Sequence, residues 1–95
     1  MLRVDTRRVQ AGLLELLVSG TLDTDQVPVL DDALGRAFAE NCAVSVNMSG
    51  TIGVDRAGLS ALLAWSSRGA RLIGCPPFLR RWIRDERSSR IRERS

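Results

Sequence analysis

The sequence predicts a small α/β domain with one four-stranded mixed sheet and about three helices, in the order ββαβαβα. Three observations lead to this class. The chain of 95 residues has the size of one domain and leaves no room for a second. Short apolar runs with strand spacing alternate along it with longer stretches whose apolar residues recur at helical spacing. Strands that alternate with helices favour parallel neighbours, right-handed crossovers and helices packed on the sheet.

The first two strands are expected at Leu2–Thr6 and Leu13–Ser19, where apolar residues recur at short spacing. Residues 7–12 would turn between them, and Gly12 supplies the backbone freedom that a turn needs. The second strand has apolar side chains on both faces, at Leu13, Leu14, Leu16, Leu17 and Val18. A strand with this pattern is expected to be covered on both sides or nearly so.

The first helix follows the Gly-Thr-Leu-Asp segment that ends the second strand. Either Asp23 or Thr24 is expected to cap it, and Gln26 lies three residues after Asp23, as in a capping box. Pro28 is tolerated because it falls in or near the first turn. Residues 40–41 end the helix. One apolar stripe runs along it, at Val27, Leu30, Leu34, Ala37 and Phe38.

The next strand, turn and helix form the most informative part of the chain. The strand is expected at Ala43–Met48, and residues 49–54 are interpreted as a polar turn in which Gly50 and Gly53 take positive φ. Asp55 is the natural N-cap of a helix from residue 56 to about residue 67. Since the first backbone N–H groups of a helix have no helical partner, we expect the function to lie at this helix start.

A short strand and a third helix complete the chain. Gly69 ends the second helix, the strand is expected at Ala70–Gly74, and Pro77 suits the first position of the last helix. Residues 87–95 either prolong that helix or fray. We therefore assign residues 1–86 to the domain and residues 87–95 to an Arg-rich tail or helix extension.

Composition argues against catalysis and against cofactors. The chain has no His, no Ser or Cys nucleophile with a general base nearby in the sequence, and no set of metal ligands. The glycines at 50 and 53 do not form a phosphate-binding loop, because no Lys follows them and their spacing is wrong. We expect a protein that is not an enzyme and that uses no metal or cofactor.

The two cysteines and the hydropathy bear on localisation. Cys42 and Cys75 lack the spacing of metal ligands, and the sequence shows no signal peptide. These features predict reduced thiols in a cytoplasmic protein. No apolar run approaches the length of a membrane span, so we expect no membrane insertion.

Basic residues are concentrated near the C-terminus. All 14 of them are Arg, and the net charge is +3. Half of them occur at Arg80, Arg81, Arg84, Arg87, Arg90, Arg92 and Arg94. Such a cluster can contact nucleic acid or an anionic membrane. Acidic residues are interleaved with it and no aromatic residue follows Trp82, which favours a solvated helix face over binding of single strands.

Several short motifs follow one another along the chain. They are Gly20-x-Leu22-Asp23, Val44-x-Val46-Asn47-Met48-Ser49-Gly50, Val54-Asp55-x-Ala57-Gly58-Leu59 and Gly69-x-x-Leu72. Their order and spacing resemble the STAS domain, a family that includes the bacterial anti-sigma factor antagonists. The resemblance covers roughly residues 2–85. It implies a small sheet with helices packed against one side, and a function in protein–protein contact rather than catalysis.

The resemblance also implies a missing switch. Phospho-regulated members of the family carry Ser or Thr just before the Gly of Asp-x-(Ser/Thr)-Gly, where a kinase that is also the anti-sigma factor phosphorylates it. Here Ala57 occupies that position and has no hydroxyl to modify. Asn47 stands where the family usually has Asp, whereas Asp23 and Asp55 match. The alternative phosphoacceptors nearby are Ser49, Thr51 and Ser60.

The partner-binding patch is expected around the start of the second helix. Its members are Asp23, Thr24, Asp55, Arg56, Ala57, Gly58, Leu59 and Ser60. A cation in the first turn of a helix opposes the helix dipole, so Arg56 is expected to pair with Asp23, Asp55 or a carboxylate of the partner. Trp65 lies off the apolar stripe of the second helix, which includes Leu59 and Leu62, and is expected to be half exposed, as an interface anchor or as a rim residue under the last helix. Trp82 is expected in the core.

Three hypotheses about function follow. The first is a non-enzymatic protein–protein interaction module of bacterial signalling and transcription regulation, whose partner is an anti-sigma factor or serine kinase-like ATPase domain. The second is a small cytoplasmic STAS subunit of a lipid-transport ABC complex, although those relatives commonly keep a Thr near Ala57. The third is an accessory nucleic-acid binder that uses the Arg-rich tail. Assembly as a homodimer is a further option.

Overall fold

A computed structural model describes residues 2–40 and 42–94 of the chain. The predicted α/β class and the order ββαβαβα are confirmed. The elements are β1 (Leu2–Gln10), β2 (Leu13–Leu22), α1 (Val27–Ala39), β3 (Ala43–Val54), α2 (Arg56–Ser67), β4 (Arg71–Ile73) and α3 (Pro77–Arg94).

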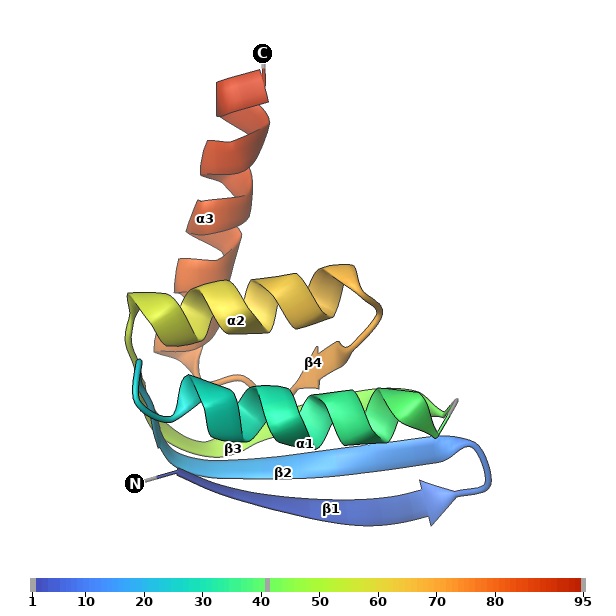
Figure 1. Cartoon of the computed structure of the whole chain (residues 1–95). Coiled ribbons are helices and arrows are strands. Elements are labelled where there is room, and N and C mark those ends of the chain that lie inside the picture. The colour runs from blue at the N-terminus through green and yellow to red at the C-terminus, as the bar shows by residue number, and fades with distance from the viewer. Residues whose placement is uncertain (1, 41, 95) are drawn as a thin grey trace.

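The four strands form one mixed sheet in the order β1-β2-β3-β4. β1 runs antiparallel to β2, whereas β2 and β3, and β3 and β4, are parallel neighbours. Parallel neighbours need a crossover connection, which α1 and α2 supply. Figure 1 shows α1 and α2 side by side over the sheet, with α3 extending away from it. This arrangement brings the C-terminal ends of β2 and β3 together with the first turn of α2.

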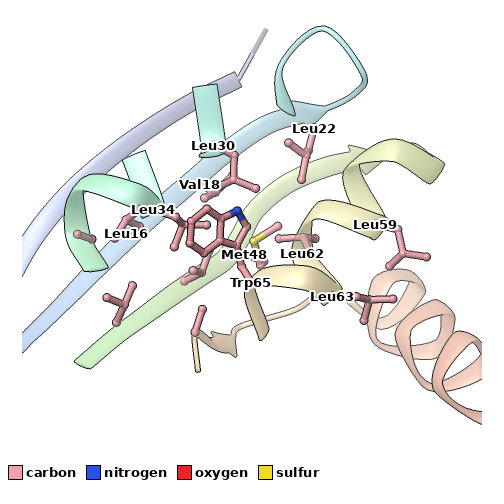
Figure 2. Close-up of a cluster of buried hydrophobic side chains, with 14 of the residues drawn as sticks. Leu16, Val18, Leu22, Leu30, Leu34, Met48, Leu59, Leu62, Leu63 and Trp65 are labelled. Carbon is pink, nitrogen blue, oxygen red and sulfur yellow. The ribbon is translucent and has the colours of Figure 1, made fainter. Parts of the chain in front are cut away.

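The hydrophobic core lies between the sheet and the two crossover helices. Leu16 of β2, Leu30 and Leu34 of α1, and Leu62 of α2 have no exposed area, and Figure 2 shows them in one cluster. Complete burial of such a side chain contributes about 1.5–3 kcal/mol relative to leaving it exposed. The predicted apolar stripe of α1 is therefore the face that packs on the sheet.

The two faces of β2 differ in burial. Leu14, Leu16 and Val18 are buried against the helices, while Leu13 and Leu17 on the opposite face are only half-buried. The strand is therefore fully covered on one side and partly covered on the other.

Three strands are longer than the sequence predicts, and β2 continues past Ser19 to Leu22. β1 continues through the expected turn to Gln10, because Arg7 lies opposite Glu15 in the register and pairs with it at 3.2 Å. Only residues 11–12 turn, and Gly12 has the positive φ (80°) that the turn requires. β3 likewise continues through residues 49–54, where it pairs with the end of β2 across two register shifts.

Gly50 and Gly53 therefore have another role than the one predicted. Neither has positive φ, because the segment is a paired strand rather than a tight turn. A Cβ at Gly50 would lie 2.9 Å from the Cβ of Ser19 and 3.2 Å from the carbonyl oxygen of Val18. Glycine is needed at this position because the two strands approach each other closely.

Helix α1 begins later than the capping-box pattern predicts. Its N-cap is Gln26, which makes no side-chain capping hydrogen bond, and Pro28 falls at the second position. The carbonyl oxygen of Asp23 accepts hydrogen bonds from the N–H groups of Gln26 and Val27, both at 3.0 Å. Residues 24–26 thus form a separate turn before the helix, and Asp23 stabilises that turn instead of capping the helix itself.

Helix α3 begins at Pro77, as predicted, and runs through residue 87 to Arg94. Leu79 and Ile83 attach its first turns to the core, with 0% and 8% of their areas exposed. Figure 2 shows Leu59 and Leu63 of α2 on the side where α3 lies. Trp82, which was expected in the core, is only partly buried at its edge. Ser95 lies outside the described residues.

Candidate functional site

The candidate site is at the end of the sheet where β2 and β3 finish. Leu22 and Val54 are the last paired residues of these two strands. The N–H of Asp55 donates to the carbonyl oxygen of Leu22 at 3.1 Å, which prolongs the pairing by one residue. Helix α2 begins at the next residue, so its first turn is fixed against the end of β2.

The carboxylate of Asp55 joins two segments that are 31 positions apart in the sequence. Its Oδ1 accepts from the N–H of Gly58 at 2.8 Å, which confirms the predicted N-cap of α2. Its Oδ2 accepts from the N–H of Thr24 at 2.9 Å and from the Thr24 hydroxyl at 3.0 Å. Asp55 therefore caps the helix and also holds the turn that follows β2.

These hydrogen bonds stabilise the ionised form of the carboxylate. The N–H of Gly58 has the largest effect and the Thr24 backbone and hydroxyl add to it, so the pKa of Asp55 lies below its ordinary value of 3.8, although partial desolvation opposes the shift. Asp55 is therefore negatively charged at neutral pH, and its charge lies at the positive end of the α2 dipole.

Asp23 has a local structural role. Its Oδ1 accepts from the N–H of Gln26 at 3.1 Å within the turn that precedes α1. Asp23 and Asp55 thus stabilise two consecutive segments of the same sheet end. Both of these predicted site residues therefore lie at the same end of the sheet, and the carboxylate of each accepts hydrogen bonds from backbone N–H groups.

Gly58 is buried where α2 comes closest to β2. A Cβ at this position would lie 2.5 Å from the carbonyl oxygen of Leu22 and 2.9 Å from its Cγ. Real Cβ atoms essentially never lie so close to another heavy atom. The first turn of α2 can reach its position only because residue 58 has no side chain.

The predicted patch divides into an exposed part and a buried part. Thr24, Arg56 and Ser60 are exposed, and Ala57 is half-buried. Gly58 is buried and Leu59 has only 2% of its area exposed, so both belong to the core rather than to the surface. Leu59 is buried because it faces α3, a neighbour that helical spacing alone does not reveal.

Arg56 pairs with neither of the aspartates that the sequence suggested. Its guanidinium donates to Glu86 of α3 at 3.3 Å, and 77% of the side chain stays exposed. This ion pair joins the start of α2 to the middle of α3. An exposed pair of this kind contributes little to stability, so Arg56 remains available to another carboxylate.

Ile52 is a surface residue that the sequence analysis did not select. It lies three residues before Asp55 on β3, and 80% of its area is exposed. Residues 49–54 were interpreted as a polar turn, and a branched aliphatic side chain is unusual in such a turn. This mismatch was the sequence feature that could have identified Ile52 as a candidate site residue. A partner that covers this side chain would remove a large apolar area from water, which favours binding.

Asn47 uses its side chain within the sheet. Its Oδ1 accepts from the N–H of Ser49 at 3.0 Å, and its Nδ2 donates to Glu15 at 3.4 Å. Thr51 is also internal, with 4% of its area exposed and its hydroxyl directed at the Val18 carbonyl oxygen. Of the alternative phosphoacceptors, only Ser49 and Ser60 are exposed.

Trp65 is a core residue, contrary to the prediction of half exposure. Only 7% of its area is exposed, and its Nε1 donates to Asp31 of α1 at 2.7 Å. Its ring stacks on Phe38 with centroids 5.5 Å apart, and Arg68 covers it at 4.4 Å. Trp65 therefore joins α1 to α2 and is not an interface anchor.

The remaining chemistry of the described residues is sparse. Cys42 and Cys75 are free and half-buried, and burial raises the pKa of the Cys75 thiol above 9.0 while Arg80 opposes the shift. Within residues 2–40 and 42–94, no group of three or more Cys, Asp or Glu is placed to hold a metal ion. No helix of the described chain has the length and apolar character needed to cross a membrane.

Comparison with known proteins identifies the fold. No model of a known protein family matches the chain, and no curated protein sequence matches it significantly. Solved structures do match. An anti-sigma factor antagonist from Mycobacterium paratuberculosis superposes with a TM-score of 0.80 and 21% identity, over 96% of this chain and 82% of that one. The STAS domain of an antisigma-factor antagonist from Rhodobacter sphaeroides gives 0.58 and 23%, over 77% and 86%.

This chain has a STAS-like fold. A third similar structure is the phosphorylated form of the Bacillus cell fate determinant SpoIIAA, with a TM-score of 0.67 and 15% identity over 88% of this chain and 83% of that one. At these identities the likeness concerns the fold. In the STAS-like domain described here, the position before Gly58 carries the methyl group of Ala57.

Proposed function

We propose that this STAS-like domain is a non-enzymatic protein–protein interaction module of the anti-sigma factor antagonist type, and that it binds its partner without a phosphorylation switch. The observation that carries the proposal is the surface held together by Asp55. We call it the docking surface, and it consists of Thr24, Ile52, Arg56, Ala57 and Ser60. Structural neighbours that are anti-sigma factor antagonists support the same class of function.

The docking surface has the chemistry of a small binding site. Ile52 offers an apolar side chain with 80% of its area exposed, and Arg56, four residues later, offers an exposed guanidinium. Thr24 and Ser60 add hydroxyl groups. A partner that fits would provide an apolar pocket for Ile52 and an acidic group for Arg56. We infer that this partner is an anti-sigma factor or serine kinase-like ATPase domain, and that the two proteins meet in the cytoplasm.

The absence of a switch follows from Ala57. A phosphoryl group at this position would add about two negative charges at the start of α2, next to the carboxylate of Asp55. Alanine cannot accept it, so the charge of the docking surface stays constant. Binding is then controlled by the amounts of the two proteins and not by modification.

A mutational test uses exposed residues at opposite ends of the sheet. Ile52→Asp and Arg56→Glu change the docking surface, while Val9→Asp changes an aliphatic residue near the β1–β2 turn that is also exposed, with 48% of its area accessible. We expect the first two variants to bind the anti-sigma factor kinase of the same genome at least about tenfold more weakly, as for interface anchors. Val9→Asp should bind like the wild type. Equal binding by all three variants would refute the docking surface.

A second experiment examines the missing switch. The wild-type chain, incubated with the kinase and ATP, should gain no phosphate by intact-mass measurement and should keep its binding. Ala57→Ser restores a hydroxyl and should become phosphorylated and then release the partner. Phosphate on Ser49 or Ser60 of the wild type, with loss of binding, would overturn the unswitched mechanism.

A further inference from the structure

A second recess of the molecule lies at the other end of α2. It is a groove of about 540 Å³ between the C-terminus of α2, β4 and α3. A helix of 12 residues is about 18 Å long, so the α2 residue in this groove, Ser66, lies near the end of the helix that is opposite the docking surface. The proposed function does not use the groove.

Three arginines from two different elements line this groove. Arg71 comes from β4, and Arg80 and Arg87 come from α3. Arg80 donates to the carbonyl oxygen of Cys75 at 3.5 Å, and Arg87 donates to the hydroxyl of Ser66 at 3.1 Å. These partners are neutral, and none of the described lining residues is acidic. The positive charges of the groove are therefore not neutralised by the described side chains around it.

Five arginines elsewhere in the domain are paired with acids. Arg3, Arg7, Arg8, Arg36 and Arg56 each lie within 3.3 Å of an Asp or Glu oxygen. Among the described side chains, no such ion pair involves the three groove arginines. The groove thus brings together three arginines without an acidic partner among the described side chains, and charge complementarity calls for an anionic ligand.

The floor of the groove is apolar. Ala70 and Ile83 have 4% and 8% of their areas exposed, and Leu72 is partly buried beside them. Free carbonyl oxygens at the C-terminus of α2 would repel an anion. Here the N–H groups of Arg68, Gly69 and Ala70 donate hydrogen bonds to carbonyl oxygens of the last turn, so this repulsion is weak. An apolar floor beneath a ring of guanidinium groups fits a ligand that carries carboxylates on either side of an aliphatic side chain.

We propose that this groove binds a short acidic peptide segment of a partner protein, with an aliphatic side chain on the floor and carboxylates on Arg71, Arg80 and Arg87. Arg fits this role because its planar guanidinium pairs bidentately with carboxylates. The volume of about 540 Å³ lies in the range of pockets that hold a few side chains. Nucleic acid fits less well, because none of the described residues that line the groove is aromatic and could stack on bases.

Fluorescence anisotropy with a labelled Glu-Asp-Leu-Glu-Asp peptide tests the proposal. The test variant is the double substitution Arg71→Gln with Arg80→Gln, and the control is Arg3→Gln with Arg36→Gln, which removes the same charge from exposed sites elsewhere. We expect at least about tenfold weaker binding for the test variant and less than about twofold change for the control. A peptide with Ser in place of Leu should also bind about tenfold more weakly.

Three results would overturn the proposal. The first is no saturable binding of the peptide to the wild-type chain. The second is an equal loss in both double variants, which would reduce the effect to net charge. The third is a single-stranded DNA oligonucleotide that binds more tightly than the peptide and displaces it. None of these results affects the docking surface, so the two proposals fail independently.

Discussion

Replacing Gly58 by Ala tests how closely α2 approaches β2. The added Cβ would lie 2.5 Å from the carbonyl oxygen of Leu22. That oxygen belongs to the backbone and also accepts from the N–H of Asp55, so it cannot move aside cheaply. The matched control is Gly35→Ala in α1, where a Cβ would meet no atom within 4 Å. Both changes introduce Ala into a helix, and only one of them creates a clash.

The two variants should change stability in opposite directions. Ala in place of Gly stabilises a helix interior by up to about 1 kcal/mol, so Gly35→Ala should stabilise the domain by roughly 0.5–1 kcal/mol. Forcing an extra methyl group into a packed site costs about 1–3 kcal/mol. Because the propensity gain is similar at both positions, the difference between the two variants is about 1–3 kcal/mol and measures the clash.

Thermal and urea unfolding followed by circular dichroism will measure this difference. A change of 1 kcal/mol shifts the midpoint of a domain of this size by about 4–8 °C. Gly58→Ala should therefore melt clearly below Gly35→Ala, and Gly35→Ala slightly above the wild type. If Gly58→Ala were as stable as Gly35→Ala, the close contact between residue 58 and Leu22 would be refuted.

Two further predictions concern the hydrogen bonds of Asp55 and Trp65. Because the folded-state pKa of Asp55 is lowered, its ionised form stabilises the fold above the ordinary carboxyl pKa, and this stabilisation is lost as the pH falls through the lowered value. The urea midpoint of the wild type should thus exceed that of Asp55→Asn at neutral pH, and the two midpoints should converge as the pH falls below the ordinary carboxyl pKa of 3.8. A gap that does not change with pH would contradict this reasoning. Trp65→Phe removes the hydrogen bond to Asp31 and should lower the unfolding free energy by about 1.5–3 kcal/mol. Trp82→Phe, at the edge of the core, should lower it by less. The reverse ranking in urea unfolding would show that Trp65 does not join the helices.

Local sequence signals predicted the order of elements because each depends on near neighbours. The alternation in β2, the apolar stripe of α1 and the cap at Asp55 all involve residues at most four or five positions apart. The extension of β3 through residues 49–54 could not be predicted in this way. Its polar, Gly-rich composition also suits a turn, and what decides the outcome is pairing with residues 19–22, which are distant in the sequence.

The candidate site was predicted in part, for the same reason. Helical spacing shows which residues share a face, but it does not show which neighbours cover the other faces. Leu59 is buried because α3 lies on its side, and Trp65 is buried because Phe38 and Asp31 of α1 contact it. Ile52 was missed because its exposure depends on the path of the extended strand.

The hydrogen bonds from Thr24 to Asp55 also imply that the docking surface, in the function proposed above, would form only late in folding. They connect chain positions that meet only after α1 and β3 have taken their places in the sheet. A synthetic peptide that spans residues 50–67 would contain Ile52 and Arg56 but would lack both Thr24 and the Leu22 carbonyl group. Fragments and incompletely folded chains would therefore not compete for the proposed partner, which would bind only the completely folded domain.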